Sequence, residues 1–137
     1  MAEIVYDMIE NQFQSYMGSI FEEICRQYLW QLNRQGHLPF AFTVLGRWWG
    51  ANPSTRQQEK IDIVAADSNQ KNAIICECKW RNELTDVSVL DRLAERSKLL
   101  PYNLNYLYLF SKSDFSDTCI NAAKQMGNVT LVTFQEM

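Results

Sequence analysis

The segments that decide the fold of this chain are Lys60-Ile-Asp-Ile-Val-Ala-Ala66 and Ala73-Ile-Ile-Cys-Glu-Cys-Lys-Trp80. Both are rich in isoleucine and other apolar residues and are bounded by turn-forming residues, which predicts β-strands. The connection over 67–72 is too short for a crossover helix, so the two strands are expected to pair antiparallel. Three charged residues interrupt the apolar pattern: Asp62, Glu77 and Lys79.

The neighbouring segments extend this pair into a larger fold. Residues 42–49 predict a strand before the pair, and the three strands together form an antiparallel meander. Upstream, apolar residues recur at three- and four-residue steps over 10–35, which predicts a long helix that Gly36 ends. Downstream, the patterns predict a helix, a strand, a helix and a strand, over 86–100, 104–110, 116–126 and 129–134.

The predicted order α-β-β-β-α-β-α-β places the chain in the α/β class. A strand–helix–strand unit implies parallel strands joined by a right-handed crossover. Helices are therefore expected on both faces of a mixed β-sheet, in three layers. The strand at 104–110 is almost continuously apolar and is expected in the centre of the sheet. Because no repeat or linker interrupts the sequence, residues 1–137 are expected to form a single domain.

Composition narrows the functional classes. Hydrophobic residues make up 47% and charged residues 21% of the chain, as in ordinary globular domains. The sequence has no apolar run of the roughly 18 residues that a membrane span requires, and no signal peptide precedes its four cysteines. We therefore expect reduced thiols in a cytoplasmic protein. The only histidine, His37, lies in a predicted loop and is not expected to be catalytic.

The net charge of −3 disfavours a freestanding nucleic-acid binder, whose surface is usually basic. It does not exclude such a function, because clustered carboxylates that hold a cation contribute to the same balance. The charge therefore directs attention to where the acidic residues lie, and two of them stand in the apolar strands quoted above.

The charged residues of these strands suggest a metal site. Side chains alternate along a strand, so Glu77 and Lys79 share one face, and the neighbouring strand can bring Asp62 close to Glu77. Adjacent carboxylates repel each other, and Mg²⁺ or Mn²⁺, which prefer oxygen ligands, relieves that repulsion. The backbone carbonyl of Cys78 is a further candidate ligand, and Lys79 is placed to activate water or to stabilise a scissile phosphate. The alternative is an internal ion pair of Lys79 with Glu77 or Asp62 that has no catalytic task.

At these residues the chain resembles the PD-(D/E)XK nuclease superfamily, with Asp62 at the aspartate position and Glu77-Cys78-Lys79 at the E-x-K motif. The predicted α-β-β-β-α-β order matches the restriction-endonuclease-like core of that superfamily. Many members add a glutamate from the first helix within Gly-x-x-x-Glu, which implies a metal-binding role for Glu22, with Glu23 as the second choice. The resemblance implies hydrolysis of phosphodiester bonds with Mg²⁺ or Mn²⁺, on nucleic acid, with DNA as the expected substrate.

A closer resemblance rests on Gly46-Arg-Trp-Trp-Gly50, Ile61-Asp-Ile-Val64, Glu77-Cys-Lys-Trp-Arg81 and Leu109-Phe-Ser-Lys-Ser113. Together they look like the C-terminal domain of unknown function of archaeal-type AAA ATPases. This resemblance implies an upstream ATP-binding module. The sequence has no Gly-x-x-x-x-Gly-Lys-Ser/Thr loop, so the chain is expected to be the C-terminal fragment of a longer ATPase. It departs from that family at Lys60, where an acidic residue is frequent.

Four residues beside the predicted site are candidates for nucleic-acid contact: Arg47, Trp48, Arg81 and Lys112. Tryptophan can stack on bases, and cations at strand ends can bind phosphate. For each of them an ordinary structural or solvated role is the alternative. The pair Trp48 and Trp49 points to opposite sides of a strand, so one is expected in the core and the other at a sheet edge.

The remaining charges allow other functions. The mixed charges of the helix at 86–100 indicate a solvated face: Asp91, Arg92, Glu95, Arg96 and Lys98. The domain could retain the site without cleaving and serve its ATPase as a nucleic-acid-binding or regulatory module. It could also be a protein-interaction domain whose charged triad is only an ion pair. A Mn²⁺ titration separates these possibilities, because a metal site gains thermal stability by mass action.

Overall fold

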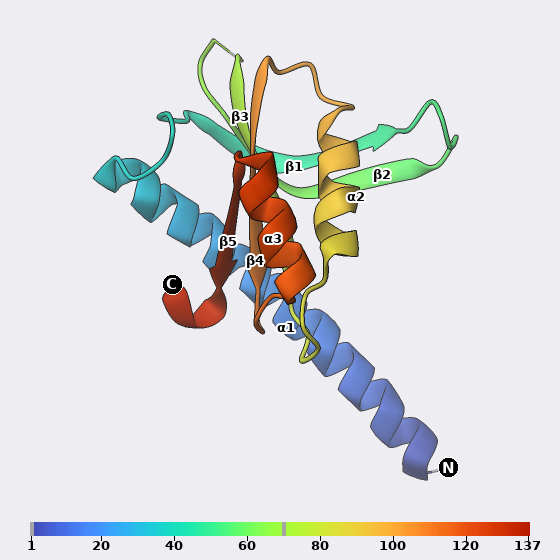
Figure 1. Cartoon of the computed structure of the whole chain (residues 1–137). Helices are drawn as coiled ribbons and strands as arrows, with labels where there is room; N and C mark the ends of the chain where they lie inside the picture. Colours follow the sequence, from blue (N-terminus) through green and yellow to red (C-terminus); the bar gives the residue numbers. More distant parts are fainter. Residues whose placement is uncertain (1, 70) are drawn as a thin grey trace.

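The computed structural model describes residues 2–69 and 71–137 and is organised around one five-stranded sheet (Figure 1). In spatial order the strands are β1 (Val44–Ala51), β2 (Gln58–Ala66), β3 (Asn72–Lys79), β4 (Leu104–Ser111) and β5 (Val129–Thr133). The first three pair antiparallel, and β4 and β5 join them in parallel. The antiparallel meander and the mixed sheet predicted from the sequence are confirmed.

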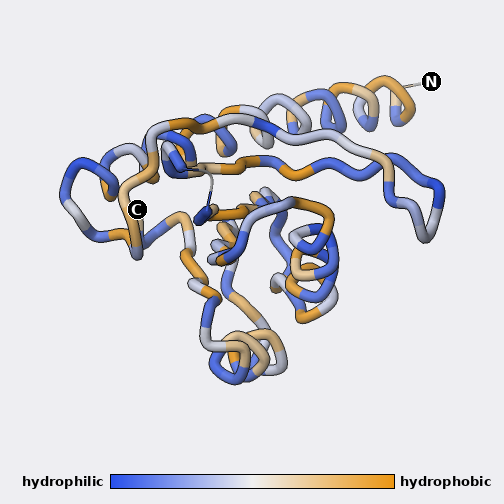
Figure 2. Tube along the Cα trace, turned by 90° about the horizontal axis from the view of Figure 1, so that it is seen from above, coloured by the Kyte–Doolittle hydropathy of each residue, from blue (hydrophilic) through white to orange (hydrophobic). Residues whose placement is uncertain are grey.

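Helices cover both faces of the sheet. α1 (Ala2–Gln35) lies on one face, and α2 (Val87–Ser97) and α3 (Asp117–Met126) lie on the other, as Figure 2 shows. A short 3-10 helix, η1 (Phe134–Glu136), follows β5. The element order and the three layers are those of the predicted α/β fold, and they are consistent with a restriction-endonuclease-like core.

The hydrophobic core has two halves, one on each face of the sheet. The half under α1 is formed by buried residues of that helix and of the central strands, among them Phe21, Cys25, Leu29, Ile63 and Cys76. The half under α2 and α3 includes Ile61, Ile75, Leu90, Leu93, Leu109 and Cys119. β4 is buried from Leu107 to Ser111, which confirms its central place. All four cysteines are free thiols.

Local sequence signals set the helix ends that frame the site. Gly36 adopts a φ of +72°, a left-handed conformation that glycine accepts without steric cost, and it ends α1 as predicted. Asp86 caps α2 by accepting a hydrogen bond from the backbone N–H of Val87 at 2.8 Å. Ser116 caps α3 and also donates to the carboxylate of Asp86 at 2.7 Å, which ties the two helix starts together. α2 ends at Ser97, before the predicted residue 100.

A β-bulge in β2 breaks the alternation of its side chains. In the register of β1 on β2, two residues of β2, Asp62 and Ile63, lie opposite Arg47 alone. Ile61 consequently packs on the side of α2 and α3, whereas Ile63 packs on the side of α1. Bulges re-aim side chains and are frequent beside active sites. Asp62 lies at this bulge and is buried, between two isoleucines in the sequence that pack on opposite faces of the sheet.

The first half of α1 extends away from the body of the molecule (Figure 1). Its large apolar side chains are each more than half exposed: Ile4, Val5, Tyr6, Met8, Ile9, Phe13 and Tyr16. They spread over a broad arc of the helix instead of forming one narrow stripe, which is why the predicted helix began only at residue 10. Within residues 2–69 and 71–137, no helix combines the length and the apolar character needed to cross a membrane.

Candidate active site

Asp62 lies at the point where β2 and β3 stop pairing. The last paired residues are Ile63 and Cys76, so Asp62 and Glu77 are the next residues on the two strands. Beyond that pair the backbone N–H of Cys78 donates to Asp62 Oδ2 at 2.9 Å, in place of a bond between the two backbones. The Asp62 side chain is thereby held in a fixed orientation, and the residue is only 5% exposed.

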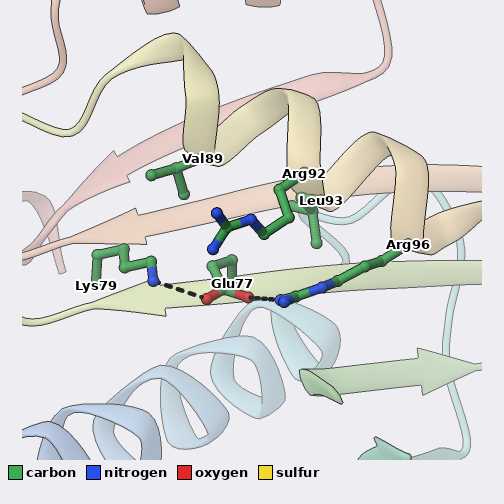
Figure 3. A pocket seen from close by; sticks show the side chains of 6 residues that line it. All are labelled: Glu77, Lys79, Val89, Arg92, Leu93 and Arg96. Carbon is green, nitrogen blue, oxygen red and sulfur yellow. Dashed lines mark ion pairs between the residues drawn. The ribbon is translucent and has the colours of Figure 1, made fainter. Parts of the chain in front are cut away.

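Glu77 and Lys79 lie at the C-terminal end of β3 and face α2 (Figure 3). Lys79 Nζ lies 3.2 Å from Glu77 Oε1, so these side chains share one face as predicted. On the other side of the carboxylate, Arg96 Nη1 of α2 lies 3.6 Å from Glu77 Oε2. We call the residues Glu77, Lys79, Arg92 and Arg96 the α2-side cluster.

The Glu77 carboxylate is destabilised in its charged form. Burial raises its pKa above the ordinary value, and the negative charge of Asp62 raises it further. Lys79 and Arg96 act in the opposite direction and offset only part of this effect. Among the residues that the structure describes, no donor forms a hydrogen bond with Glu77 Oε2, although that atom is buried. Two carboxylates therefore lie close enough to repel, and one of their oxygens lacks a donor.

A second charged group lies on the opposite side of the strand separation, toward α1. Lys60 Nζ is 3.0 Å from Asp62 Oδ1 and 3.7 Å from Glu22 Oε1, so one ammonium bridges two carboxylates. Arg47 Nη2 lies 3.0 Å from Glu22 Oε2. We call the residues Glu22, Arg47, Lys60 and Asp62 the α1-side network. Glu23, the second choice for the helix glutamate, pairs instead with Arg26 at 2.9 Å on the exposed surface.

Lys60 is held in its charged form. Burial by itself lowers its pKa, but the hydrogen bond and charge of Asp62, together with the charge of Glu22, outweigh burial and raise the pKa above the ordinary value. Lys60 stands at the position where the family that the chain resembles often has an acidic residue. Its ammonium therefore occupies the space between two of the carboxylates predicted to bind a cation.

The structure corrects the prediction for the outer face of α2. Arg96 is not solvated: its Nε lies 2.7 Å from Glu59 Oε2, and its side chain is only 19% exposed. Lys98 and Glu95 do form the expected exposed pair, at 2.9 Å. Charge alternation alone suggested one solvated surface, whereas the helical period places residue 96 beside Leu93, which is in the core. The three-residue spacing from Leu93 was the sequence signal that could have predicted a partly buried Arg96.

The four residues predicted to contact nucleic acid lie in different surroundings. Arg47 belongs to the α1-side network, and Trp48 packs against the core under α2. Lys112 Nζ lies 2.7 Å from the side-chain oxygen of Asn82 and 4.7 Å from the ring centroid of Trp80. Arg81 is exposed next to that pair. Trp49 is 56% exposed, so it is the tryptophan with the accessible ring, and Lys60 lies 5.9 Å from its centroid.

The predicted metal ligands converge only in part. Asp62, Glu77 and the backbone of Cys78 meet at the strand separation, while Glu22 reaches Asp62 through Lys60. In the part of the chain that the structure describes, no three His, Cys, Asp or Glu side chains form a ready-made group for a metal ion. Each carboxylate faces a lysine or an arginine instead, because those cations supply the compensating charge.

Comparison with known proteins relates the chain to others. It is 34% identical over 102 residues to Uncharacterized protein MJECL04 of Methanocaldococcus jannaschii, a match that covers 72% of this chain and 22% of the relative. The chain thus spans about a fifth of that protein's length. Among solved structures, the DNA modification-dependent restriction endonuclease AspBHI aligns with a TM-score of 0.43 and 13% identity, over 90% of this chain and 33% of that one. Residues 1–93 match DUF234, "Archaea bacterial proteins of unknown function", and the chain belongs to that family.

Proposed function

We propose that this chain is a metal-dependent phosphodiester hydrolase domain that acts on nucleic acid, with DNA as the expected substrate. The observation that carries the proposal is the meeting of Asp62 and Glu77 at the separation of β2 and β3. Their charges are close enough that Asp62 raises the pKa of Glu77, and Lys79 Nζ lies 3.2 Å from Glu77 Oε1. Paired carboxylates with an adjacent lysine are suited to phosphodiester hydrolysis.

The residues at this point fit Mg²⁺ or Mn²⁺. Glu77 Oε2 is buried and accepts no hydrogen bond from the described residues, and an unsatisfied carboxylate oxygen beside a second carboxylate attracts a hard cation. We assign its ligands to Asp62, Glu77 and the backbone carbonyl of Cys78, with Glu22 as a further ligand. A bound cation supplies charge stabilisation at the phosphate and a more acidic water molecule.

The chain's own residues have separate tasks in this proposal. The Cys78 N–H orients Asp62, which is therefore positioned before any ligand arrives. Lys79 keeps its ammonium beside Glu77 and donates hydrogen bonds to the attacking water or to a phosphate oxygen. Lys60 has to release Asp62 and Glu22 for both to face a cation, because it contacts both of them.

An incubation with candidate substrates tests this proposal. The wild-type chain would be incubated with Mn²⁺ and single-stranded, duplex or branched DNA, or RNA, alongside Asp62→Asn. The Asn side chain can still accept the Cys78 N–H, so this variant keeps the local hydrogen bond and loses the charge. We expect cleavage of at least one substrate by the wild type and none by the variant. Equal cleavage by the wild type and the variant, or cleavage of none of the four substrates by the wild type, would refute the hydrolase proposal.

A second candidate is a domain that binds nucleic acid, or regulates a larger protein, without cleaving. Lys60 favours this alternative, because its ammonium already supplies the positive charge between Asp62 and Glu22. Retained binding to DNA, with no turnover under any divalent cation, would select this function over hydrolysis.

We further propose that the chain acts in the cytoplasm as one domain of a longer ATPase. The match to about a fifth of a longer relative supports a multidomain setting. The exposed apolar first half of α1 offers a surface on which another domain could pack, because patches of this kind usually mark contacts. Hydrogen exchange in the longer protein tests this: protection of residues 4–16 beyond that in the isolated chain supports the contact, and equal exchange opposes it.

A further inference from the structure

The α2-side cluster contains one cation, Arg92, that forms no ion pair with a carboxylate of the described residues. Its pocket lies between β3 and α2 and is lined by Glu77, Lys79, Val89, Arg92, Leu93 and Arg96 (Figure 3). Figure 3 shows the Arg92 guanidinium directed into this pocket, above the Glu77 carboxylate. Arg92 is nevertheless absent from every ion pair and side-chain hydrogen bond among residues 2–69 and 71–137.

The other two cations of the cluster are already bound. Lys79 pairs with Glu77, and Arg96 is held by Glu59 at 2.7 Å while its second nitrogen approaches Glu77 at 3.6 Å. With Glu59, the partner of Arg96, included, the cluster has three cations and two carboxylates. The surplus positive charge lies at the mouth of the pocket, because Arg92 is exposed whereas Glu77 is buried. Such an arrangement favours an anion that approaches from solvent.

Arginine pairs bidentately with carboxylates and with phosphates, and of the two the proposed function favours a phosphate. A planar guanidinium presents parallel N–H donors that match two oxygens of a phosphate, and it stays charged at every physiological pH. We propose that Arg92 binds a backbone phosphate of nucleic acid on the α2 side of the site. This inference rests on the proposed function and names the substrate group that α2 recognises.

A binding measurement in EDTA tests the inference without hydrolysis. The probe is a fluorescein-labelled single-stranded DNA, and its anisotropy gives the dissociation constant at salt concentrations from about 50 to 200 mM. We expect Arg92→Gln to weaken binding about tenfold and to reduce the slope of log K against log salt by about 0.7, because one phosphate contact is lost. Arg92→Lys should restore the slope and only part of the affinity, because lysine keeps the charge but lacks the parallel N–H donors of the guanidinium.

Lys98→Gln is the matched control. Lys98, the C-cap residue of α2, is a cation that is paired with Glu95 on the exposed surface, so its loss should leave the affinity and the slope unchanged. Arg92→Gln should unfold at the wild-type temperature, because Arg92 has no partner among the described residues. Wild-type binding that Arg92→Gln leaves intact in affinity and slope would overturn the inference alone. A wild type that does not bind this probe would also overturn the inference, whereas the proposed function is tested separately by the incubation with Mn²⁺ and the four substrates.

Discussion

The two sides of the strand separation handle buried charge differently. In the α1-side network, Lys60 contacts both Asp62 and Glu22, so the charges nearly satisfy one another. In the α2-side cluster, a buried oxygen of Glu77 accepts no hydrogen bond from the described residues, and Arg92 has no partner there. Burying charge costs free energy unless it is compensated. Because the charges of the α2-side cluster are incompletely compensated, a bound ligand would contribute the most stabilisation there.

The largest expected effect is a difference in nuclease activity between variants of the two lysines of the site, Lys79 and Lys60. Lys79→Ala should lower nuclease activity about 100-fold or more, because it removes the donor beside Glu77. Lys60→Ala should preserve turnover when the metal is saturating, because Lys60 holds ligands and does not act on the phosphate. Initial cleavage rates at saturating Mn²⁺ measure both variants. A greater loss with Lys60→Ala than with Lys79→Ala would reverse the roles that we assign to the two sides.

A smaller effect concerns competition between Lys60 and the metal. The Lys60 ammonium lies 3.0 Å from Asp62 Oδ1 and would compete with a metal ion for that carboxylate. Lys60→Gln removes the competing positive charge. We expect the variant to bind Mn²⁺ about tenfold more tightly than the wild type in calorimetric titration. Lys71→Gln, at an exposed position in the β2–β3 connection, is the charge-matched control. Equal Mn²⁺ affinity in all three proteins would show that Lys60 does not compete.

Glu77→Gln tests the incomplete compensation on the α2 side. Burial and Asp62 raise the pKa of Glu77, so this change should stabilise the metal-free chain by about 1 kcal/mol. The sign of the pH dependence follows from the same shift. The folded state holds the Glu77 proton more tightly than the unfolded state, so lowering the pH from neutrality should stabilise the wild type relative to Glu77→Gln. Urea unfolding of both proteins at several pH values measures this difference, and a reversed trend would contradict the assignment.

The smallest effect is the pH dependence that Lys60 contributes. Its folded pKa is raised, so its contribution to stability is complete below the unfolded pKa of about 10.5 and is lost as the pH rises through the folded value. Because the side chain is 38% exposed, solvent screening should keep this contribution well below about 1 kcal/mol. Wild type and Lys60→Gln should therefore converge in unfolding free energy above that range. A difference that widens there would have the wrong sign.

The sequence predicted what depends on local pattern. Alternation along β3 placed Glu77 and Lys79 on one face, and the short connection placed Asp62 on the neighbouring strand, as the structure confirms. The β-bulge could not be predicted, because it arises from the register between β1 and β2 and not from either strand alone. The start of α1 was missed because its apolar residues form no stripe. Arg96 was misjudged because its partner Glu59 is distant in sequence, on β2.

The central claim is that Asp62 and Glu77 form one cation site, and thermal unfolding in the presence of Mn²⁺ tests it most directly. The unfolding midpoint of the wild type should rise steadily with the logarithm of Mn²⁺ concentration, because the ion binds only the folded state. The double variant Asp62→Asn/Glu77→Gln should show no such rise. A wild-type midpoint that does not respond to Mn²⁺, or an equal rise in the double variant, would contradict the claim.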